Sequence, residues 1–215
     1  MKESEARQLL VKYGRRIYEK GFIAGTDGNL SVRLKSGAIV VTPAGRAKGF
    51  LAGQDMVVVD REGKITSSSG RPSSELLMHL AVYRNRPEIT ACCHAHPPFA
   101  TAFSITGRKV PEGILPEVIV SVGKISLIAY APPGTEMVPK ALEKYIKTSQ
   151  AFILRNHGVL TIGRNMEEAY DRMETVEHYI KIIYIAETKG KLNFLDKNEI
   201  RRLEKIRTAK LRETE

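Results

Sequence analysis

The sequence predicts a layered α/β domain whose central sheet is substantially antiparallel. Two observations favour this fold class: amphipathic helical segments flank short β-rich runs, and many of those runs are joined by tight turns. Tight turns can join antiparallel strands, whereas parallel strands need a crossover of about a dozen residues or more. The 215 residues contain no internal repeat, low-complexity segment or linker, so we expect one domain over residues 1–215.

Helices are expected where apolar residues recur every three to four positions. In residues 3–20 these include Leu10, Tyr13 and Ile17, and Gly21 marks the end. The helix at 73–87 begins with serines, which are good N-cap residues. The other helices are expected at 99–107, 137–149, 166–190 and over the last 20 residues.

Strands are expected in β-rich runs bounded by glycine, proline or polar turns. A glycine-rich turn leads into the strand of 25–34, and two prolines end the strand of 88–96 because proline has no N–H to donate. The remaining strands are expected at 38–43, in a hairpin at 56–66, once or twice in 118–135, and in a hairpin at 151–163 with Asn156–His157–Gly158 at its turn.

Composition narrows the class of protein. The formal net charge is +10, but lysine and arginine are scattered among acidic residues, so we expect an anionic small substrate and no nucleic-acid partner. No apolar run approaches the roughly 20 residues that span a bilayer, and the N-terminus lacks the features of a signal peptide. We therefore expect no membrane association and a cytoplasmic location. The two cysteines are adjacent, which excludes a disulfide framework.

Three histidines form a candidate metal site. His94 and His96 lie two residues apart on a predicted strand, so their side chains project from the same face about 6.6 Å apart. Two imidazoles at this spacing can converge on one ion, and His157 in its turn could supply a third ligand. The spacing alone equally allows two partly exposed strand histidines and an unrelated turn histidine. Cys92 shares the face of His94 but lies too far from His96 for one ion, so we expect both cysteines in the core.

Three short segments could bind a phosphate group. The turn GTDGNLS (25–31), the loop TPAGR (42–46) and the serines at 73–74 offer backbone N–H groups and hydroxyl donors. Each segment alone is weak evidence, because a glycine turn is often only a turn. Glu75 follows the two serines, and taken alone it is a first-turn acid that interacts with the helix dipole.

Five motifs occur together in an order that resembles the class II aldolase/adducin family. They are GTDGNLS (25–31), TPAG (42–45), SSE (73–75), HAH (94–96) and NHG (156–158). The resemblance extends from about residue 4 to residue 190. It implies a three-layer αβα sandwich, which with the strand pattern predicts a mixed, mostly antiparallel central sheet. It also implies a homotetramer with active sites between subunits.

The resemblance also implies roles for individual residues. It implies one Zn(II) per subunit, held by His94, His96 and His157, with Glu75 as a fourth ligand that moves away to act as general base. The positions implied to hold the substrate phosphate are Gly28, Asn29, Ala44, Gly45, Ser73 and Ser74. The implied reaction splits a short deoxyketose 1-phosphate, such as L-fuculose 1-phosphate, into dihydroxyacetone phosphate and an aldehyde. The negative charge of the enediolate formed on the way is stabilised by the metal as a Lewis acid.

The chain departs from the family's aldolases in its proton donor. Their tyrosine between the HxH strand and the NHG turn, supplied by a neighbouring subunit, is absent from VPEGILPEVIVSVG (110–123). Glu117 lies at or beside that position and is the candidate second catalytic residue. Their C-terminal tyrosine is also absent, and Ala44 replaces a residue that carries a hydroxyl group.

These departures leave two alternatives to the zinc-dependent aldolase. An acidic residue at Glu117 is also what the family's ribulose-5-phosphate 4-epimerases and methylthioribulose-1-phosphate dehydratases have, although the epimerases usually carry Asp at Glu75. The second alternative is a metal-free binding protein like the adducin head, which the intact histidines and Glu75 argue against. For His79, one turn after Glu75, a place on the helix face is favoured over support of the metal site, and His178 is assigned no function.

Overall fold

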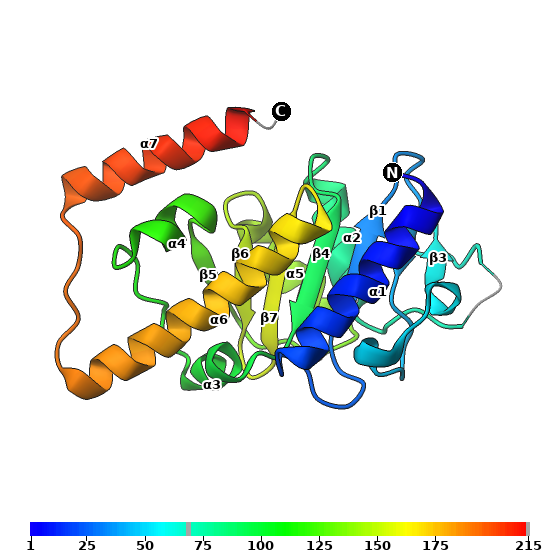
Figure 1. Ribbon diagram of the computed structural model, residues 1–215, viewed down its shortest axis with the longest axis horizontal. Helices are drawn as coiled ribbons and strands as arrows, with labels where there is room; N and C mark the ends of the chain where they lie inside the picture. Colours follow the sequence, from blue (N-terminus) through cyan, green and yellow to red (C-terminus); the bar gives the residue numbers. More distant parts are fainter. Residues whose placement is uncertain (68–69, 214–215) are drawn as a thin grey trace.

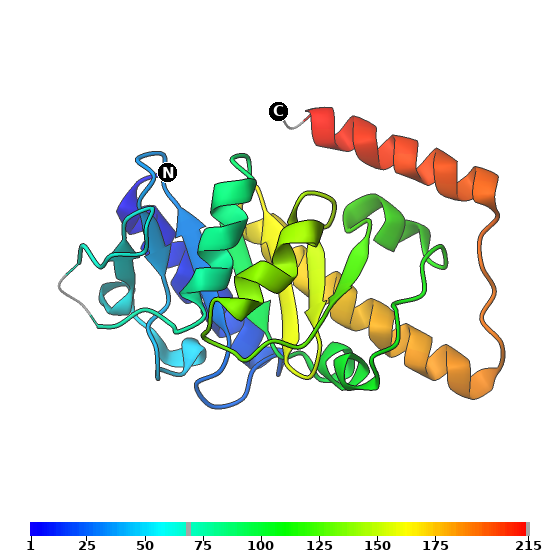
Figure 2. The ribbon, with the colours of Figure 1, turned by 180° about the vertical axis from the view of Figure 1, so that it is seen from behind.

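The computed structural model describes residues 1–67 and 70–213, and it contains one mixed seven-stranded sheet with helices on both faces. Figure 1 shows α1 (Glu3–Glu19) and α6 (Met166–Lys189) across one face. Figure 2, from behind, shows α2 (Leu76–Asn85) and α5 (Met137–Ile146) across the other. The predicted three-layer αβα sandwich is confirmed.

The sheet has the strand order β3-β2-β1-β4-β7-β6-β5. Every neighbouring pair is antiparallel except β5 and β6, which are parallel and are connected through α5. The mixed, mostly antiparallel sheet is therefore as predicted. The strands are β1 (Asn29–Arg33), β2 (Ile39–Val41), β3 (Val57–Val59), β4 (Ala91–Ala95), β5 (Ile125–Ile128), β6 (Ala151–Leu154) and β7 (Gly158–Gly163).

Each face of the sheet has its own apolar core. Leu10 of α1 and Ile180 of α6 pack on one face, and Leu80 of α2 packs on the other. Side chains alternate along β4, so Cys93 joins the first core and Cys92 the second. Both thiols are fully buried, as predicted, and burial raises the pKa of Cys92 to about 12.

Two predicted strand segments differ in detail from the structure. One or two strands were expected within 118–135, and the structure has one, β5, while residues 118–122 lie in α4 (Pro116–Ser121) and its C-cap. Pro116 occupies the first helical turn, and Val118 and Val122, four residues apart, bury one helical face, which outweighs the β propensity of the valines. The predicted hairpin at 56–66 is present in short form: a turn follows β3, and Val59 and Ile65 form an antiparallel bridge.

The remaining helices frame the sheet. They are α3 (Pro98–Thr106), α7 (Lys197–Glu213) and the short 3-10 helices η1 (Lys48–Phe50) and η2 (Gly53–Asp55). Figure 1 shows α7 beyond α4, joined to α6 by an extended segment. Leu203 anchors α7, and Arg207 donates to the Val122 carbonyl over 3.2 Å. Within the described residues, no helix is long and apolar enough to cross a bilayer.

Candidate metal centre and active site

The three predicted histidines meet at one end of the sheet. His94 is the fourth residue of β4, His96 follows the last residue of that strand, and His157 lies in the turn before β7. Because β4 and β7 are neighbours, the three rings come together with centroids 4.8–5.1 Å apart. One ligand atom from each ring lies within 4.8 Å of the other two, so the group could hold a metal ion.

Glu75, at the residue before α2, joins two of these rings. Its Oε1 lies 3.0 Å from His157 Nε2, and its Oε2 lies 3.2 Å from His94 Nε2. Asn29 Nδ2 donates to Oε2 over 2.9 Å. The register of β1 on β4, which pairs Asn29 with His94, places that amide beside the carboxylate.

The donor atoms suit one metal ion held by the three histidines, with the Glu75 carboxylate beside it. Two ligands on a tetrahedral zinc with bonds near 2.0–2.1 Å lie about 3.3 Å apart. The Nε2 atoms of His94 and His96 are 3.2 Å apart, and the contacts of Glu75 are 3.0 and 3.2 Å. His94 Nδ1 lies 2.9 Å from the Val159 carbonyl and can donate to it, which leaves the Nε2 lone pair for a metal. Glu75 Oε1 is buried and has no partner in hydrogen-bond geometry, as expected of a ligand atom.

The electrostatics favour the ligand forms of Glu75 and His96, whereas at His94 burial, which lowers the pKa, is outweighed by the Glu75 carboxylate, which raises it. Burial alone would raise the pKa of Glu75, but the His94 and His157 rings hold it well below its usual range, so the carboxylate is ionised. Burial, together with the His94 and His157 rings, lowers the pKa of His96 to about 4. A neutral imidazole and an ionised carboxylate are the forms that bind a metal.

Two glycines allow the close approach of these segments. A Cβ on Gly158 would lie 2.5 Å from His96 Cδ2, so only glycine lets the NHG turn pass against that ring. A Cβ on Gly28, which has φ of +70°, would lie 2.9 Å from the His94 carbonyl. Asn156 takes the left-handed conformation (φ 55°) that the turn requires.

The predicted phosphate positions lie on three adjoining segments. Ala44 N donates to the Arg71 carbonyl over 2.9 Å, and Pro43 and Pro72 form a bridge, so the 42–46 loop lies beside the segment before Ser73. Ser73 Oγ accepts from Glu75 N over 3.3 Å. Asn29 is almost fully buried and its Oδ1 has no partner. We use the name phosphate loops for residues 25–29, 44–46 and 73–74. All the positions predicted to hold the phosphate lie in them, including Gly28, Gly45 and Ser74.

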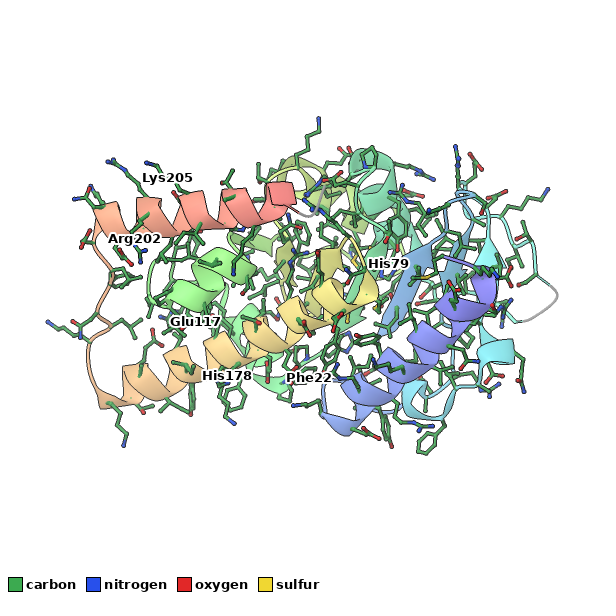
Figure 3. The ribbon with its side chains drawn as sticks, turned by 45° about the horizontal axis from the view of Figure 1, so that its top comes forward. Phe22, His79, Glu117, His178, Arg202 and Lys205 are labelled. Atoms are coloured by element: carbon green, nitrogen blue, oxygen red, sulfur yellow. The ribbon has the colours of Figure 1, made fainter. Side chains whose placement is uncertain are left out.

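The structure does not bring Glu117 to this group within one chain. Glu117 is exposed at the start of α4, which precedes β5. His157 follows the end of β6, and β6 runs parallel to β5, so the two residues belong to opposite ends of the sheet. In Figure 3 Glu117 lies between α6 and α7. A role for Glu117 therefore stays a prediction, and it requires a neighbouring subunit.

Three polar residues support the site, and the sequence pattern did not single out two of them. His79 is fully buried on α2; its Nδ1 lies 2.7 Å from Ser31 Oγ, and burial lowers its pKa to about 3. The carboxylate of Glu177 accepts from Phe99 N and Ala100 N and so caps α3 directly after the HAH segment. Lys48 is buried between two of the phosphate loops. His178, in contrast, is exposed on α6.

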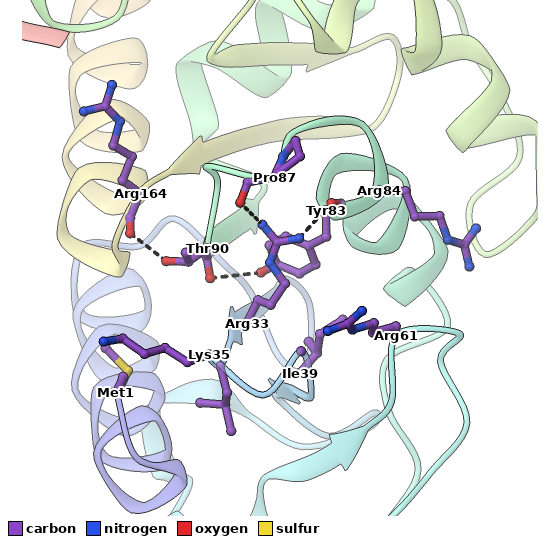
Figure 4. Close-up of a pocket in the computed structure, with 12 residues that line it drawn as sticks. Met1, Arg33, Lys35, Ile39, Arg61, Tyr83, Arg84, Pro87, Thr90 and Arg164 are labelled. Atoms are coloured by element: carbon purple, nitrogen blue, oxygen red, sulfur yellow. Dashed lines mark hydrogen bonds between the residues drawn. The ribbon is translucent and has the colours of Figure 1, made fainter. Parts of the chain in front are cut away.

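A basic cavity of about 600 Å³ lies at the opposite end of β1, around Arg33 (Figure 4). The Arg33 guanidinium donates to four backbone carbonyls and lies over the aromatic ring of Tyr83. In Figure 4 the guanidinium groups of Arg84 and Arg164 point away from Arg33. We therefore assign Arg33 to the structure of the 83–89 segment rather than to substrate binding.

Comparison with known proteins identifies the family. The family described as "Class II Aldolase and Adducin N-terminal domain" matches residues 8–184, and the chain belongs to it. The chain is 34% identical to the 3-oxo-tetronate 4-phosphate decarboxylase of Haemophilus influenzae over 95% of this chain and 98% of that protein. It is 35% identical to an L-fuculose phosphate aldolase of Methanococcus maripaludis over 84% of this chain and 96% of that protein.

Solved structures give the same family likeness. YgbL of Escherichia coli superposes with a TM-score of 0.89 and 32% identity, covering 94% of this chain and 99% of that one. An L-fuculose 1-phosphate aldolase superposes with a TM-score of 0.88 and 30% identity, covering 95% and 97%. The fold thus belongs to a superfamily whose named members include both aldolases and decarboxylases. Class II aldolases depend on a metal ion, and the His94, His96 and His157 group could hold one.

Proposed function

We propose that the protein is a zinc-dependent lyase that breaks a carbon–carbon bond of a phosphorylated sugar and releases dihydroxyacetone phosphate by way of its enediolate. The observation that carries this proposal is the position of Glu75. Its carboxylate touches two of the three clustered histidines and is hydrogen-bonded to Asn29 of the phosphate loops. A general base thus stands between the metal ligands and the groups proposed to hold the phosphate.

Each part of the site has a distinct task in this proposal. His94, His96 and His157 hold one Zn(II), with Glu75 as a fourth ligand at rest. The ion, when bound, supplies a Lewis acid for negative charge on the substrate's oxygens. Glu75 moves a proton to or from the reacting carbon or its hydroxyl group. The phosphate loops fix the phosphate end, so that the carbonyl group is presented to Glu75.

Aldol cleavage of a ketose 1-phosphate such as L-fuculose 1-phosphate is the first candidate reaction. The hydroxyl group on the departing carbon loses its proton, the carbon–carbon electron pair stays with the ketone half, and an aldehyde leaves. The enediolate then takes up a proton to give dihydroxyacetone phosphate. This reaction needs one group to remove a proton and one to deliver it. Glu75 is the first, and we propose Glu117 of a neighbouring subunit in a homotetramer as the second.

Decarboxylation of 3-oxo-tetronate 4-phosphate is the second candidate, and a specific observation favours it. Loss of CO₂ from this β-keto acid leaves the same electron pair on the same three-carbon phosphate, and only one proton has to be delivered. Glu75 can deliver this proton after its carboxylate has taken one up from solvent, and no second acid is needed. Within the described residues two carboxylates contact the histidine group: Glu75, and Asp27, which lies 3.5 Å from His96 Nδ1 and is half exposed. The absence of the aldolases' tyrosine from 110–123 agrees with this simpler requirement.

One assay tests the shared proposal and separates the candidates. Zinc-loaded protein is incubated with each substrate, and dihydroxyacetone phosphate is measured by NADH oxidation with glycerol-3-phosphate dehydrogenase. Product from L-fuculose 1-phosphate identifies an aldolase, and product with CO₂ from 3-oxo-tetronate 4-phosphate identifies a decarboxylase. If neither substrate yields product, the lyase proposal fails. Turnover of methylthioribulose 1-phosphate or ribulose 5-phosphate would then favour a dehydratase or epimerase.

Metal analysis tests the remaining alternative. A zinc content near one equivalent per chain supports the enzyme. Less than a tenth of an equivalent of any divalent metal, with no zinc uptake, would favour a metal-free binding protein of the adducin kind.

A further inference from the structure

Lys48 joins two of the phosphate loops from inside the protein. Its Nζ donates to the Thr26 carbonyl over 2.6 Å and to the Arg46 carbonyl over 2.9 Å. Thr26 precedes Gly28 and Asn29, and Arg46 follows Ala44 and Gly45. The side chain is buried, with the residue only 2% exposed. A buried ammonium group therefore lies behind both backbone segments that are proposed to meet the phosphate.

The backbone and Cβ of Lys48 pack closely against α1. A Cβ on Gly14 would lie 2.8 Å from the Lys48 carbonyl, and a Cβ on Gly49 would lie 2.5 Å from the Tyr18 ring. This packing leaves η1 little freedom to shift away from α1. The ammonium group consequently keeps its position between the two loops.

The charge of Lys48 is not balanced by a contact. Among the described side chains, no carboxylate lies within 4 Å of its Nζ, and both acceptors are neutral carbonyls. Burial lowers the pKa of Lys48 to about 8, and the more distant charges of Asp27 and Glu75 only partly offset this. The residues of α1 that pack there, Gly14 and Tyr18, offer no carboxylate. An isolated buried ammonium is unfavourable unless an anion compensates it.

We propose that Lys48 is a specificity-determining residue, which makes the site select a substrate with a phosphate group over its unphosphorylated counterpart. The inference rests on the proposed function, because it takes the phosphate loops as the place where the phosphate binds. The dianion in that place supplies the missing counter-charge. The Thr26 and Arg46 carbonyls hold the ammonium behind the loops, so its attraction acts through the low-polarity interior rather than through bulk water.

A purely structural role for Lys48 makes a different prediction. If Lys48 only ties the two loops together, any side chain that keeps the loops in place preserves phosphate affinity, whatever its charge. If its charge matters, affinity depends on its protonation. Wild-type affinity should then fall as pH rises above 8, and an arginine at this position, which stays charged, should remove that dependence.

The test measures binding of glycerol 3-phosphate, a phosphate monoester that the proposed lyase reaction cannot cleave. Zinc-loaded wild type, Lys48→Met, Lys48→Arg and Lys64→Met are compared by isothermal titration calorimetry at pH 7.5 and pH 9.5. Lys64→Met is the matched control, because it removes the same charge from an exposed turn. Zinc content and the thermal midpoint are measured for each variant, which shows whether the fold and the metal site are intact.

We expect Lys48→Met to raise the dissociation constant at least tenfold at pH 7.5, and Lys64→Met to change it less than twofold. Wild type should lose affinity at pH 9.5, and Lys48→Arg should lose less. Equal affinity of Lys48→Met and wild type would overturn the inference and leave the proposed function standing. If wild type binds zinc but no glycerol 3-phosphate, the phosphate half of the proposed function fails and the inference with it. Should Lys48→Met not fold, an unchanged wild-type affinity between the two pH values overturns the inference by itself.

Discussion

Asn29 Nδ2 donates to Glu75 Oε2 over 2.9 Å, and this bond joins a phosphate loop to the proposed general base. Asn29 is the first residue of β1 and Glu75 is the last residue before α2, so two elements that are distant in sequence meet here. The same Oε2 lies 3.2 Å from His94 Nε2. The bond therefore fixes one oxygen of a carboxylate that must reach both the metal ligands and the substrate.

Asn29→Ala should lower kcat by about ten- to a hundredfold, because a hydrogen bond to a charged group contributes about 1.5–3 kcal/mol. Zinc content should stay near that of wild type, because Asn29 is not one of the proposed metal ligands. Steady-state kinetics with the active substrate and zinc analysis check both. Asn85→Ala is the control, since Asn85 Nδ2 bonds only to the Ala81 carbonyl one helical turn away. An unchanged kcat in Asn29→Ala would show that Glu75 is positioned without this bond.

Glu75→Gln should retain most of the zinc and lose at least a hundredfold in kcat. The three histidines remain to hold the ion, but an amide cannot accept the proton that a general base must take. Zinc is measured by mass spectrometry and kcat by release of dihydroxyacetone phosphate. Near-wild-type turnover would remove Glu75 from the mechanism.

His94→Ala should abolish stoichiometric zinc binding. His94 is fully buried and its ring touches both of the other histidines, so its loss leaves two ligands and a cavity. His178→Ala, an exposed residue of α6, should keep the zinc and activity of wild type. If His94→Ala still binds one equivalent with unchanged affinity, the metal lies elsewhere.

The stability of the ligand-free protein should depend on the charge of Lys48. Burial lowers its folded pKa to about 8 from the usual lysine value of 10.5, so the folded state binds the proton more weakly than the unfolded state. The penalty is fully present below pH 8 and disappears as pH rises through 10.5. Relative to Lys48→Met, wild type should gain roughly 2 kcal/mol of unfolding free energy between pH 7.5 and pH 10. Urea unfolding at both pH values measures this difference, and a pH-independent difference would contradict it.

Much of the fold was predictable because periodicity and turn chemistry agree with it. The β-rich run at 88–96, ended by two prolines, and the NHG turn at 156–158 predicted strands β4, β6 and β7, and these strands bring the histidines together. The helix over 116–121 could not be predicted, because β-branched residues favour strands and only the tertiary packing of Val118 and Val122 shows that a helix buries them. A local sequence pattern therefore does not predict a short helix or strand whose conformation depends on tertiary packing.

The supporting residues of the site could not be predicted for a related reason. Lys48 and Glu177 look like ordinary charged residues of a loop and a helix, and no spacing distinguishes them. Their roles come from contacts over long sequence separations: Glu177 reaches the amides of Phe99 and Ala100, which are 78 and 77 residues away. Such contacts follow from the packing of α6 on α3 and become visible only in three dimensions.

Glu177 leads to the final prediction, which concerns both stability and the metal site. Pro97, at the N-cap of α3, makes no side-chain capping hydrogen bond. The Glu177 carboxylate caps the helix instead, because it accepts from Phe99 N at 2.9 Å and Ala100 N at 2.8 Å. Glu177 is 7% exposed, so Glu177→Ala leaves the buried amide of Ala100 and the partly buried amide of Phe99 without this acceptor. We expect a loss of about 2–4 kcal/mol in unfolding free energy, because each unsatisfied amide costs about 1–2 kcal/mol. Since α3 begins two residues after His96, zinc affinity should fall as well.

Glu177→Gln should recover part of the stability, because its amide oxygen can accept one of the two bonds. Glu174→Ala on the same helix is the control; its ion pairs with Lys20 and Arg16 are partly exposed, and their loss should change stability by less than about 1 kcal/mol. Urea unfolding and competition with a zinc-binding dye measure the two quantities. If Glu177→Ala loses stability but keeps wild-type zinc affinity, the cap stabilises α3 without positioning His96. If both stay unchanged, water replaces the carboxylate and the cap has no measurable role.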